Sequence, residues 1–279
     1  MPTTYPSANL QQIVEYRGVE GLVAAEVLTD DNDTGYTTGD VFAIAGVAEI
    51  SRTTDSSNEA HYYDNIPAVV VSNTASDTVT ISASAIPLDV LATITGQNYD
   101  STTGSLIEGP REFKYFAIGY KTQKTNGDEV YVWRYKGTFN VPDQTNTTQN
   151  DGTDANGQEI VFTGISTTHK FTKTGKGAKA LVVDVAKGLA DVSDFFEEVT
   201  TPDSLVANTA YTLTETQATG TTLSVMRNGV ALANNAAIYA GDVLTITVTG
   251  GTVTVDGEAF ISGDMHVVTG NTAIVSTAS

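Results

Sequence analysis

Short stretches in which apolar and polar residues alternate recur along the chain, and they limit the fold more than any other feature of the sequence. In residues 77–83, Val79 and Ile81 fall on one face, while hydroxyl-bearing residues occupy the other. This period of two is typical of a half-buried β-strand. Residues 41–50 are also expected to form a strand. Because Thr, Val, Ile and Tyr are abundant and Leu and Met are scarce, we expect a mainly β protein.

The clearest pair of strands flanks Asn126-Gly127, a dipeptide that supplies the positive φ angles of a tight turn. Residues 113–120 run towards this turn, and residues 130–135 return from it. On the return strand, aromatic residues alternate with valines: Tyr131, Trp133 and Tyr135 on one face, and Val130 and Val132 on the other. We therefore expect both faces of this strand to be covered.

Only two helices are expected. The first begins near Pro87, which suits a first helical turn, and ends before Gly96, which suits a C-terminal cap. Asp89 lies where a negative charge complements the helix dipole. The second helix is a short one near residues 192–198.

Three polar stretches are expected to be loops, over residues 29–35, 52–63 and 142–158. They contain too little apolar surface to order themselves. We expect them to be disordered unless a partner orders them.

A domain boundary is expected at residues 200–204, which gives domains over residues 1–200 and 201–279. Beyond it lysine disappears and short alternating strands follow. We expect residues 223–226 to pair with 230–232 across Asn228-Gly229, and residues 243–248 with 253–255 across Gly250-Gly251. A run of about 75 residues of this kind predicts a small Ig-like β-sandwich.

The chain is strongly acidic, with a formal net charge of −19. Residues 1–110 contain 15 acidic residues and only Arg17 and Arg52 as basic ones. The sequence has no basic patch of the kind that nucleic-acid binders carry, and general solubility is the simplest explanation of the charge. The absence of cysteine excludes disulfides and thiolate metal sites. We expect neither a secretory signal nor a membrane span.

No catalytic motif is evident. His61, His169 and His266 are far apart in sequence, and none accompanies a nucleophile in a known motif. Residues 174–179 resemble a phosphate-binding loop but lack its glycine spacing and the hydroxyl residue after the lysine. Residues 30–35 match the start of a calcium loop, but Val41 stands where a bidentate Glu is required. We therefore expect no enzymatic activity, no cofactor and no metal.

Several stretches occur in an order that points to a family. They are residues 60–65 (Ala-His-Tyr-Tyr-Asp-Asn), 79–81, 86–92 with Gly96, 116–120, 126–127 and 131–142. Together they resemble the phi13-type major tail (tail-tube) proteins of long-tailed siphophages, over roughly residues 8–190. Tyr63 stands where the family usually has Ala.

The resemblance implies a tail-tube β-barrel or sandwich domain with one short helix packed on it, followed by an Ig-like outer domain. It implies a major structural subunit of the virion, assembled in the host cytoplasm into stacked hexameric rings through which DNA passes. The implied partners are further copies of the chain, the tape measure protein, and the tail terminator and distal tail proteins. Double-stranded DNA would pass transiently and without specific contacts.

The resemblance also implies that the loop over residues 51–75 reaches a neighbouring ring, with Tyr62, Tyr63, Asp64 and Asn65 as candidate contact residues. An acidic N-terminal region suits a channel wall, because a basic wall would hold DNA by its phosphates. The alternative is a cell-surface or carbohydrate-binding β-sandwich protein. Its weakness is the small number of aromatic residues after position 205: Tyr211, Tyr239 and Phe260.

Overall fold

The computed structural model describes residues 13–63, 65–143 and 157–278. The chain is mainly β, with one α-helix among these residues, and its contacts divide it into two compact units. The first unit comprises the described residues up to Val183 together with Asp194–Ser204. The second comprises Asp184–Ser193 and the residues from Leu205 onwards. The chain therefore passes between the two units three times.

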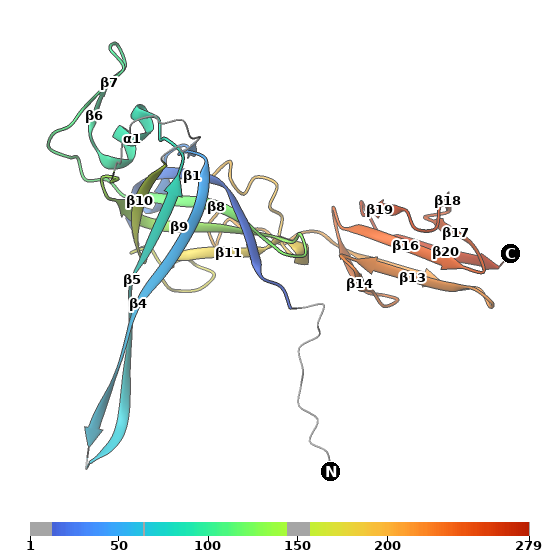
Figure 1. The fold of residues 1–279 in the computed structure, drawn as a ribbon. Coiled ribbons are helices and arrows are strands. Elements are labelled where there is room, and N and C mark those ends of the chain that lie inside the picture. The colour runs from blue at the N-terminus through green and yellow to red at the C-terminus, as the bar shows by residue number, and fades with distance from the viewer. Residues whose placement is uncertain (1–12, 64, 144–156, 279) are drawn as a thin grey trace, which may run out of the picture. The chain divides into compact units, whose positions relative to one another are not determined.

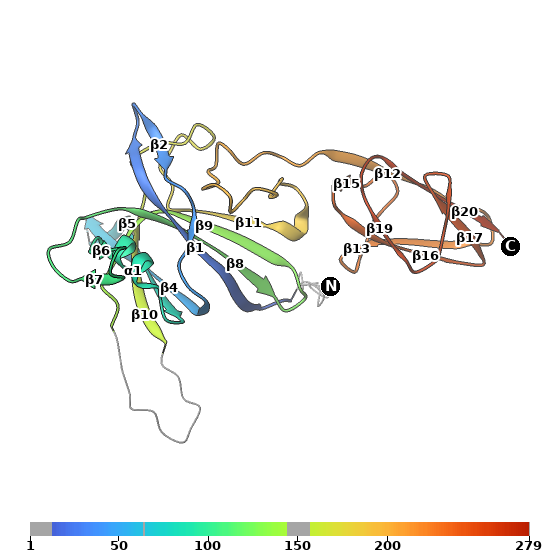
Figure 2. The same cartoon turned by 90° about the horizontal axis from the view of Figure 1, so that it is seen from above.

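A large antiparallel sheet of nine strands forms the first unit (Figures 1 and 2). Its main path is β2-β1-β8-β9-β10-β5-β4, and β3 and β11 pair with β1 and β9. The strands are β1 (Tyr16–Asp31), β2 (Gly35–Thr38), β3 (Phe42–Ala43), β4 (Val47–Tyr63), β5 (Ile66–Ala83), β8 (Phe116–Lys124), β9 (Glu129–Phe139), β10 (Gln158–Ile165) and β11 (Ala180–Asp184). Between β5 and β8 the chain forms helix α1 (Leu88–Thr95) and the small hairpin of β6 (Asn98–Asp100) and β7 (Ser105–Ile107).

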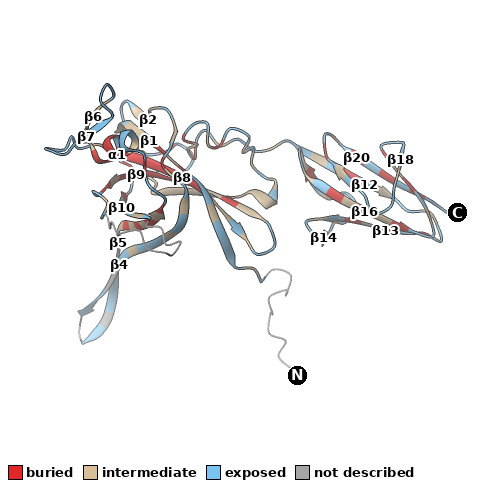
Figure 3. Ribbon diagram, turned by 45° about the horizontal axis from the view of Figure 1, so that its top comes forward, coloured by how far each residue is buried: buried red, intermediate tan, exposed pale blue. Residues whose placement is uncertain are grey.

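The predicted hairpin around Asn126-Gly127 is confirmed as β8 and β9, with Gly127 at a φ of 91°. Both faces of β9 are covered, as its alternation of aromatic residues and valines predicts. Val130 and Val132 pack with Tyr120 on one face. On the other face Trp133 and Tyr135 are fully buried. Figure 3 shows in red the buried residues of the large sheet.

The aromatic face of β9 is covered by residues 194–204. Trp133 donates its indole N–H to the carbonyl oxygen of Phe195 at 2.7 Å, and the Tyr135 hydroxyl donates to the carbonyl oxygen of Thr200 at 3.0 Å. These bonds satisfy polar groups that would be costly to bury unpaired. The helix predicted near residues 192–198 is wrong, because residues 193–199 form successive turns. Their main-chain carbonyls are thereby free to accept from β9.

Helix α1 confirms the first helix prediction. Pro87 is the residue before the first turn rather than within it, and Gly96 follows the last turn with a φ of 69°. The Gly96 N–H donates to the carbonyl oxygen of Thr93. A Cβ at this glycine would lie 1.9 Å from the carbonyl oxygen of Glu112, so no other residue fits without rearrangement. Leu91 and Ile94 face the main core of the sheet.

Two strand predictions need correction. Residues 41–50 do not form one strand, because β3 ends at Ala43 and β4 begins at Val47. Residues 29–35 are not a disordered loop either, since β1 extends to Asp31 and turns directly into β2. Of the third predicted loop, residues 144–156 lie outside the described part of the chain. No helix among the described residues is long and apolar enough to cross a membrane.

The second unit contains two sheets that share one hydrophobic core. Their strand orders are β15-β12-β20-β17-β18 and β14-β13-β16-β19. Leu213 and Ile274 of the first sheet and Val225 and Ile246 of the second all belong to this core. The strands are β12 (Ala210–Thr216), β13 (Thr222–Arg227), β14 (Val230–Ala231), β15 (Ala237–Tyr239), β16 (Val243–Thr249), β17 (Gly251–Val255), β18 (Glu258–Phe260), β19 (Met265–Val267) and β20 (Thr272–Ala278). Residues 184–193 add the 3₁₀ turn η2 (Val185–Lys187).

One predicted hairpin of this unit is confirmed and the other is wrong. Strands β13 and β14 pair as expected. Strand β16 pairs with β13 and β19, however, whereas β17 pairs with β18 and β20 in the other sheet. Gly250, with a φ of 78°, and Gly251 therefore form a corner between two sheets. A Cβ at Gly251 would lie 2.0 Å from the carbonyl oxygen of Thr277, which explains the second glycine.

Candidate functional site

Strands β4 and β5 continue beyond the main sheet as a two-stranded hairpin (Figure 1). Strand β10 pairs with β5 only from Asp77 to Ala83, so the segment before Asp77 has β4 as its partner strand. We call residues 54–76 the arm. Its pairing runs from Ser56 opposite Thr74 to Tyr63 opposite Ile66. Asn65 occupies the turn with a φ of 63°, a conformation that asparagine tolerates better than most residues.

The arm corrects the prediction of a loop over residues 51–75. The stretch of Ser, Thr, Asp and Asn in β4 lacks apolar alternation, so it resembles a loop in sequence. It forms a strand because β5 opposite it contains Val69-Val70-Val71, which favour extended backbone, and because main-chain pairing needs no apolar side chain.

Large apolar side chains are exposed at the end of the arm. The exposed fraction is 67% for Tyr62, 63% for Tyr63 and 63% for Ile66. Val70, further along β5, is 64% exposed. Of the four predicted contact residues, Tyr62, Tyr63 and Asn65 thus lie at the tip, and Asp64 lies outside the described residues. Contiguous exposed apolar side chains are typical of surfaces that contact another protein, a membrane or a ligand.

The arm is also acidic. Residues 53–76 contain three acidic residues and no lysine or arginine. Asp55 and Glu59 are both exposed on β4. The arm therefore combines exposed apolar surface with negative charge.

At the base of the arm, one buried carboxylate lies among three basic side chains. Asp77 is 3% exposed. Its Oδ2 accepts a hydrogen bond from Arg134 Nη1 at 2.9 Å and lies 3.8 Å from Arg52 Nη1, and its Oδ1 lies 3.3 Å from Lys179 Nζ. Lys179 also donates to the carbonyl oxygen of Ala75. This cluster is not evident from the sequence, since its members come from β4, β5, β9 and the residue that precedes β11.

The cluster carries more positive than negative charge. Burial by itself raises the pKa of Asp77, but hydrogen bonds from Thr54 and Lys179 and the nearby charges of Lys179 and Arg134 outweigh it, so the pKa lies below its ordinary value. Asp77 is thus ionised at neutral pH and balances one of the three cations. Arg134, whose side chain is 6% exposed, has no hydrogen-bond partner at its buried Nε. Arg52 is about half exposed, with a fraction of 52%.

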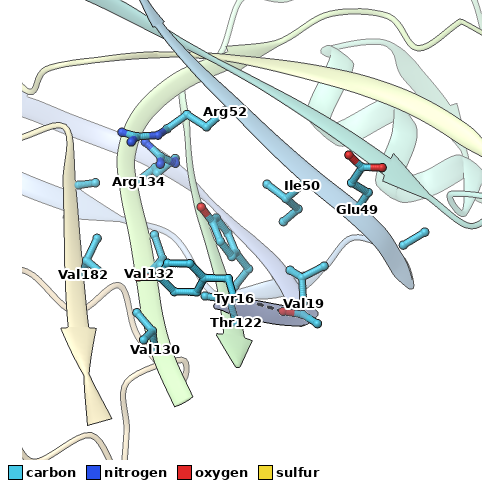
Figure 4. A pocket seen from close by; sticks show the side chains of 14 residues that line it. Tyr16, Val19, Glu49, Ile50, Arg52, Thr122, Val130, Val132, Arg134 and Val182 are labelled. Carbon is cyan, nitrogen blue, oxygen red and sulfur yellow. Dashed lines mark hydrogen bonds between the residues drawn. The ribbon is translucent and has the colours of Figure 1, made fainter. Parts of the chain in front are cut away.

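A groove of about 590 Å³ adjoins this cluster (Figure 4). Most of its lining side chains are apolar, and they come from five strands: Val19 of β1, Ile50 of β4, Tyr120 of β8, Val130 and Val132 of β9, and Val182 of β11. Arg52 and Arg134 lie together at one end. Val182 is 59% exposed on β11, so this wall of the groove is open to solvent.

The calcium-like residues 30–35 are held by hydrogen-bond donors instead of converging on a cation. The carboxylate of Asp30 accepts from Lys136 Nζ at 2.6 Å and from the main-chain N–H groups of Thr168 and His169. Although burial raises the pKa of Asp30, these bonds lower it further than burial raises it. Asp31 accepts from the N–H groups of its own turn. Among the described residues no cluster of side chains is arranged to hold a metal ion.

The remaining candidate residues do not assemble into a site. His61 lies on the arm, His169 has its Nδ1 3.0 Å from the Asp31 carbonyl oxygen, and His266 belongs to β19 of the second unit. Of the phosphate-loop-like residues 174–179, the first two belong to a tight turn over residues 172–175, which a bridge between Phe171 and Lys176 closes. Of these residues only Lys179 lies near the groove, because its ammonium group contacts Asp77 at the basic end.

The geometry therefore defines a mainly β protein with two surface features in its first unit: an acidic arm with an apolar tip, and an apolar groove with a basic end. No family model matches this chain, and no curated protein matches it.

Proposed function

We propose that this chain is a self-assembling structural protein, the major subunit of a phage tail tube, and not an enzyme. The observation that carries the proposal is the arm, a two-stranded hairpin whose exposed tip bears Tyr62, Tyr63 and Ile66. Isolated two-stranded hairpins are marginal in water. An arm of this length with apolar side chains facing solvent is typical of a segment that a partner covers.

The edges of the large sheet favour a partner that is another copy of the same chain. The path ends at β2 and β4, and the described length of β4 pairs only with β5. Exposed strand edges are a template for further pairing, and closed rings are a common way of covering them. We propose stacked hexameric rings, as the resemblance to tail-tube proteins implies.

The finer fold belongs to the same proposal. Strand β1 contacts β4 although they lie far apart on the path, which supports a curled, barrel-like tube domain. The two sheets and single core of the second unit support an Ig-like sandwich on the outside of the tube. The acidic N-terminal region supports a channel that double-stranded DNA crosses without being held. The tape measure, terminator and distal tail proteins are the further partners proposed, and the virion is the proposed location.

Electron microscopy of the purified full-length chain in negative stain tests this proposal. Hollow tubes or six-fold rings are the expected result. A monodisperse monomer at every protein and salt concentration would overturn it, and glycan binding by such a monomer would favour the cell-surface alternative.

A matched truncation tests the role of the arm. Residues 57–73 are replaced by Asn-Gly, which joins the paired residues Ser56 and Thr74 through a two-residue turn. We expect a folded subunit that forms no tubes, because the body of the sheet keeps its core. Tubes of normal length from this variant would show that assembly does not need the arm. Circular dichroism and thermal unfolding serve as the control for folding.

A further inference from the structure

The groove is lined mainly by apolar side chains, and part of this lining is left open by the described residues of the chain. Val130 and Val132 of β9 are buried, whereas Val182 on the neighbouring strand β11 is 59% exposed. An apolar groove open on one side gains free energy when an apolar segment fills it.

At the basic end of the groove, three cations share a single carboxylate. Asp77 is the one carboxylate that contacts Arg52, Arg134 and Lys179 in the described chain. Two positive charges are left in excess, and the Nε of Arg134 is without a partner. Because charged groups near a protein interior are stabilised by opposite charges, a second carboxylate is the group that this end would bind.

The arm has the matching chemistry. It carries Glu59 and Asp55 on β4 and exposes Tyr62, Tyr63 and Ile66 at its tip. Acidic charge next to apolar side chains complements the end of the groove where Arg52 and Arg134 lie next to valines. The one acidic lining residue, Glu49, lies away from these two arginines (Figure 4). Residues 53–76 contain no lysine or arginine, so this segment has no such positive charge that would repel Arg52 and Arg134.

The arm cannot fill the groove of its own chain. Arg52 and Glu59 lie on the same strand, seven residues apart, which corresponds to roughly 23 Å of extended chain. The pairing of β4 with β5 across this whole stretch keeps the strand extended. Glu59 can therefore reach only the Arg52 of another molecule.

We propose that the arm of one copy binds in the groove of a second copy, with Glu59 near Arg52 and Arg134 and the apolar tip against the valines. This inference rests on the proposed self-assembly and names its contact surfaces. Since arm and groove are different surfaces, the contact is heterologous and propagates from copy to copy instead of stopping at a dimer.

A charge exchange tests the contact. Arg52→Glu and Glu59→Lys should each raise the concentration needed for assembly by about tenfold or more, because like charges would then meet at the groove. In the double variant, position 52 is negative and position 59 is positive. The two charges are again opposite, so assembly should recover. Lys176→Glu and Glu108→Lys, two exposed residues outside the groove, are the matched controls and should assemble as the wild type does.

Each outcome of this exchange is decisive. If the wild type assembles and both single variants assemble equally well, the arm-to-groove contact is wrong and the proposed function stands. If the single variants fail and the double variant also fails, the pairing of these two residues is wrong. A wild type that never assembles overturns the proposed function, and the contact with it.

Cross-linking gives an independent test, since the natural chain contains no cysteine. In the variant with both Arg52→Cys and Glu59→Cys, the two thiols of one chain are too far apart for a disulfide, which needs Cα atoms within about 7 Å. Oxidation of assembled protein should therefore give a ladder of multimers on a non-reducing gel, whereas each single variant should give dimers at most. Assemblies that yield no ladder would overturn the contact.

Discussion

Two long antiparallel hairpins of the first unit, β8–β9 and the arm of β4–β5, have the same backbone geometry but differ in what stabilises them. In β9, Trp133 and Tyr135 are fully buried on one face, and Val132 is buried on the other. In the arm, Tyr62 and Tyr63 are more than half exposed. The first hairpin is held by its core. The second has main-chain pairing but little side-chain burial, so its full stabilisation requires a partner.

The largest expected effect is on the buried hairpin. Trp133→Ala removes a fully buried indole and one of the two donors to the carbonyl oxygen of Phe195, which keeps only the Thr200 hydroxyl. We expect a loss of about 3–5 kcal/mol in the free energy of unfolding. Urea denaturation measures this loss: the midpoint of unfolding should fall, while the slope m of the unfolding free energy against urea concentration stays unchanged.

The matched change in the arm is Tyr63→Ala, which should alter the free energy of unfolding of the unassembled subunit by no more than about 0.5 kcal/mol. Its effect should appear in tube formation instead. Equal destabilisation by the two substitutions would show that the arm has a core of its own.

Asp77, where the arm meets the sheet, should give the next largest effect. Asp77→Asn removes the negative charge from between Arg134 and Lys179, at a cost of about 3 kcal/mol at neutral pH. The folded-state pKa of Asp77 is lowered, so its contribution is present above the unfolded value of about 3.9 and is lost as the pH falls through the folded value.

Denaturation between about pH 2 and pH 7 tests this linkage. The wild type should lose stability on acidification more steeply than the Asp77→Asn variant does. Parallel curves for the two proteins would mean that Asp77 does not titrate as a stabilising group.

Hydrogen exchange compares the two hairpins directly. In the unassembled subunit, amides of the arm should exchange faster than those of β9 by a factor on the order of 10³ or more, because the arm can open without breaking a core. After assembly the arm amides should become protected. Arm amides that exchange as slowly as those of β9 before assembly would contradict the comparison.

The smallest expected effect is that of salt on assembly. Each copy carries a net charge of −19, so copies repel one another at low ionic strength. Physiological salt, with a screening length of ~8 Å, reduces this repulsion, whereas the proposed contact between Glu59 and Arg52 of two copies would be screened less once it is covered. Sedimentation across a salt series should show a yield of tubes that rises with salt, and a falling yield would contradict the prediction.

Local signals in the sequence predicted the elements whose cause is local. The Asn126-Gly127 turn, the cap at Gly96 and the β13–β14 hairpin each depend on a few neighbouring residues, and all three are confirmed. Gly250-Gly251 failed as a hairpin because paired glycines serve a corner between sheets equally well.

The arm and the Asp77 cluster could not be found in this way. The polar β4 segment becomes a strand through pairing with the valines of β5, which alternation within one strand does not reveal. Arg134 and Lys179 are 57 and 102 positions from Asp77, and only the order of strands in the sheet brings them together. The tip residues were found through the family resemblance, since their sequence alone predicts a loop.

The interleaving of the two units affects how the protein folds during synthesis. When the ribosome has made residue 183, the aromatic face of β9 is only partly covered. Tyr36 and Phe171 can already pack on Tyr135. Phe195 and Thr200, whose carbonyls accept from Trp133 and Tyr135, have not yet been joined to the chain. Residues 184–193 must likewise wait for the strands that begin after Leu205. Unlike a chain whose domains fold one after the other from the N-terminus, this one completes its first unit only when Ser204 has been made, and by then synthesis of the second unit has already begun. The indole N–H of Trp133 therefore waits for its acceptor until 62 further residues have been added.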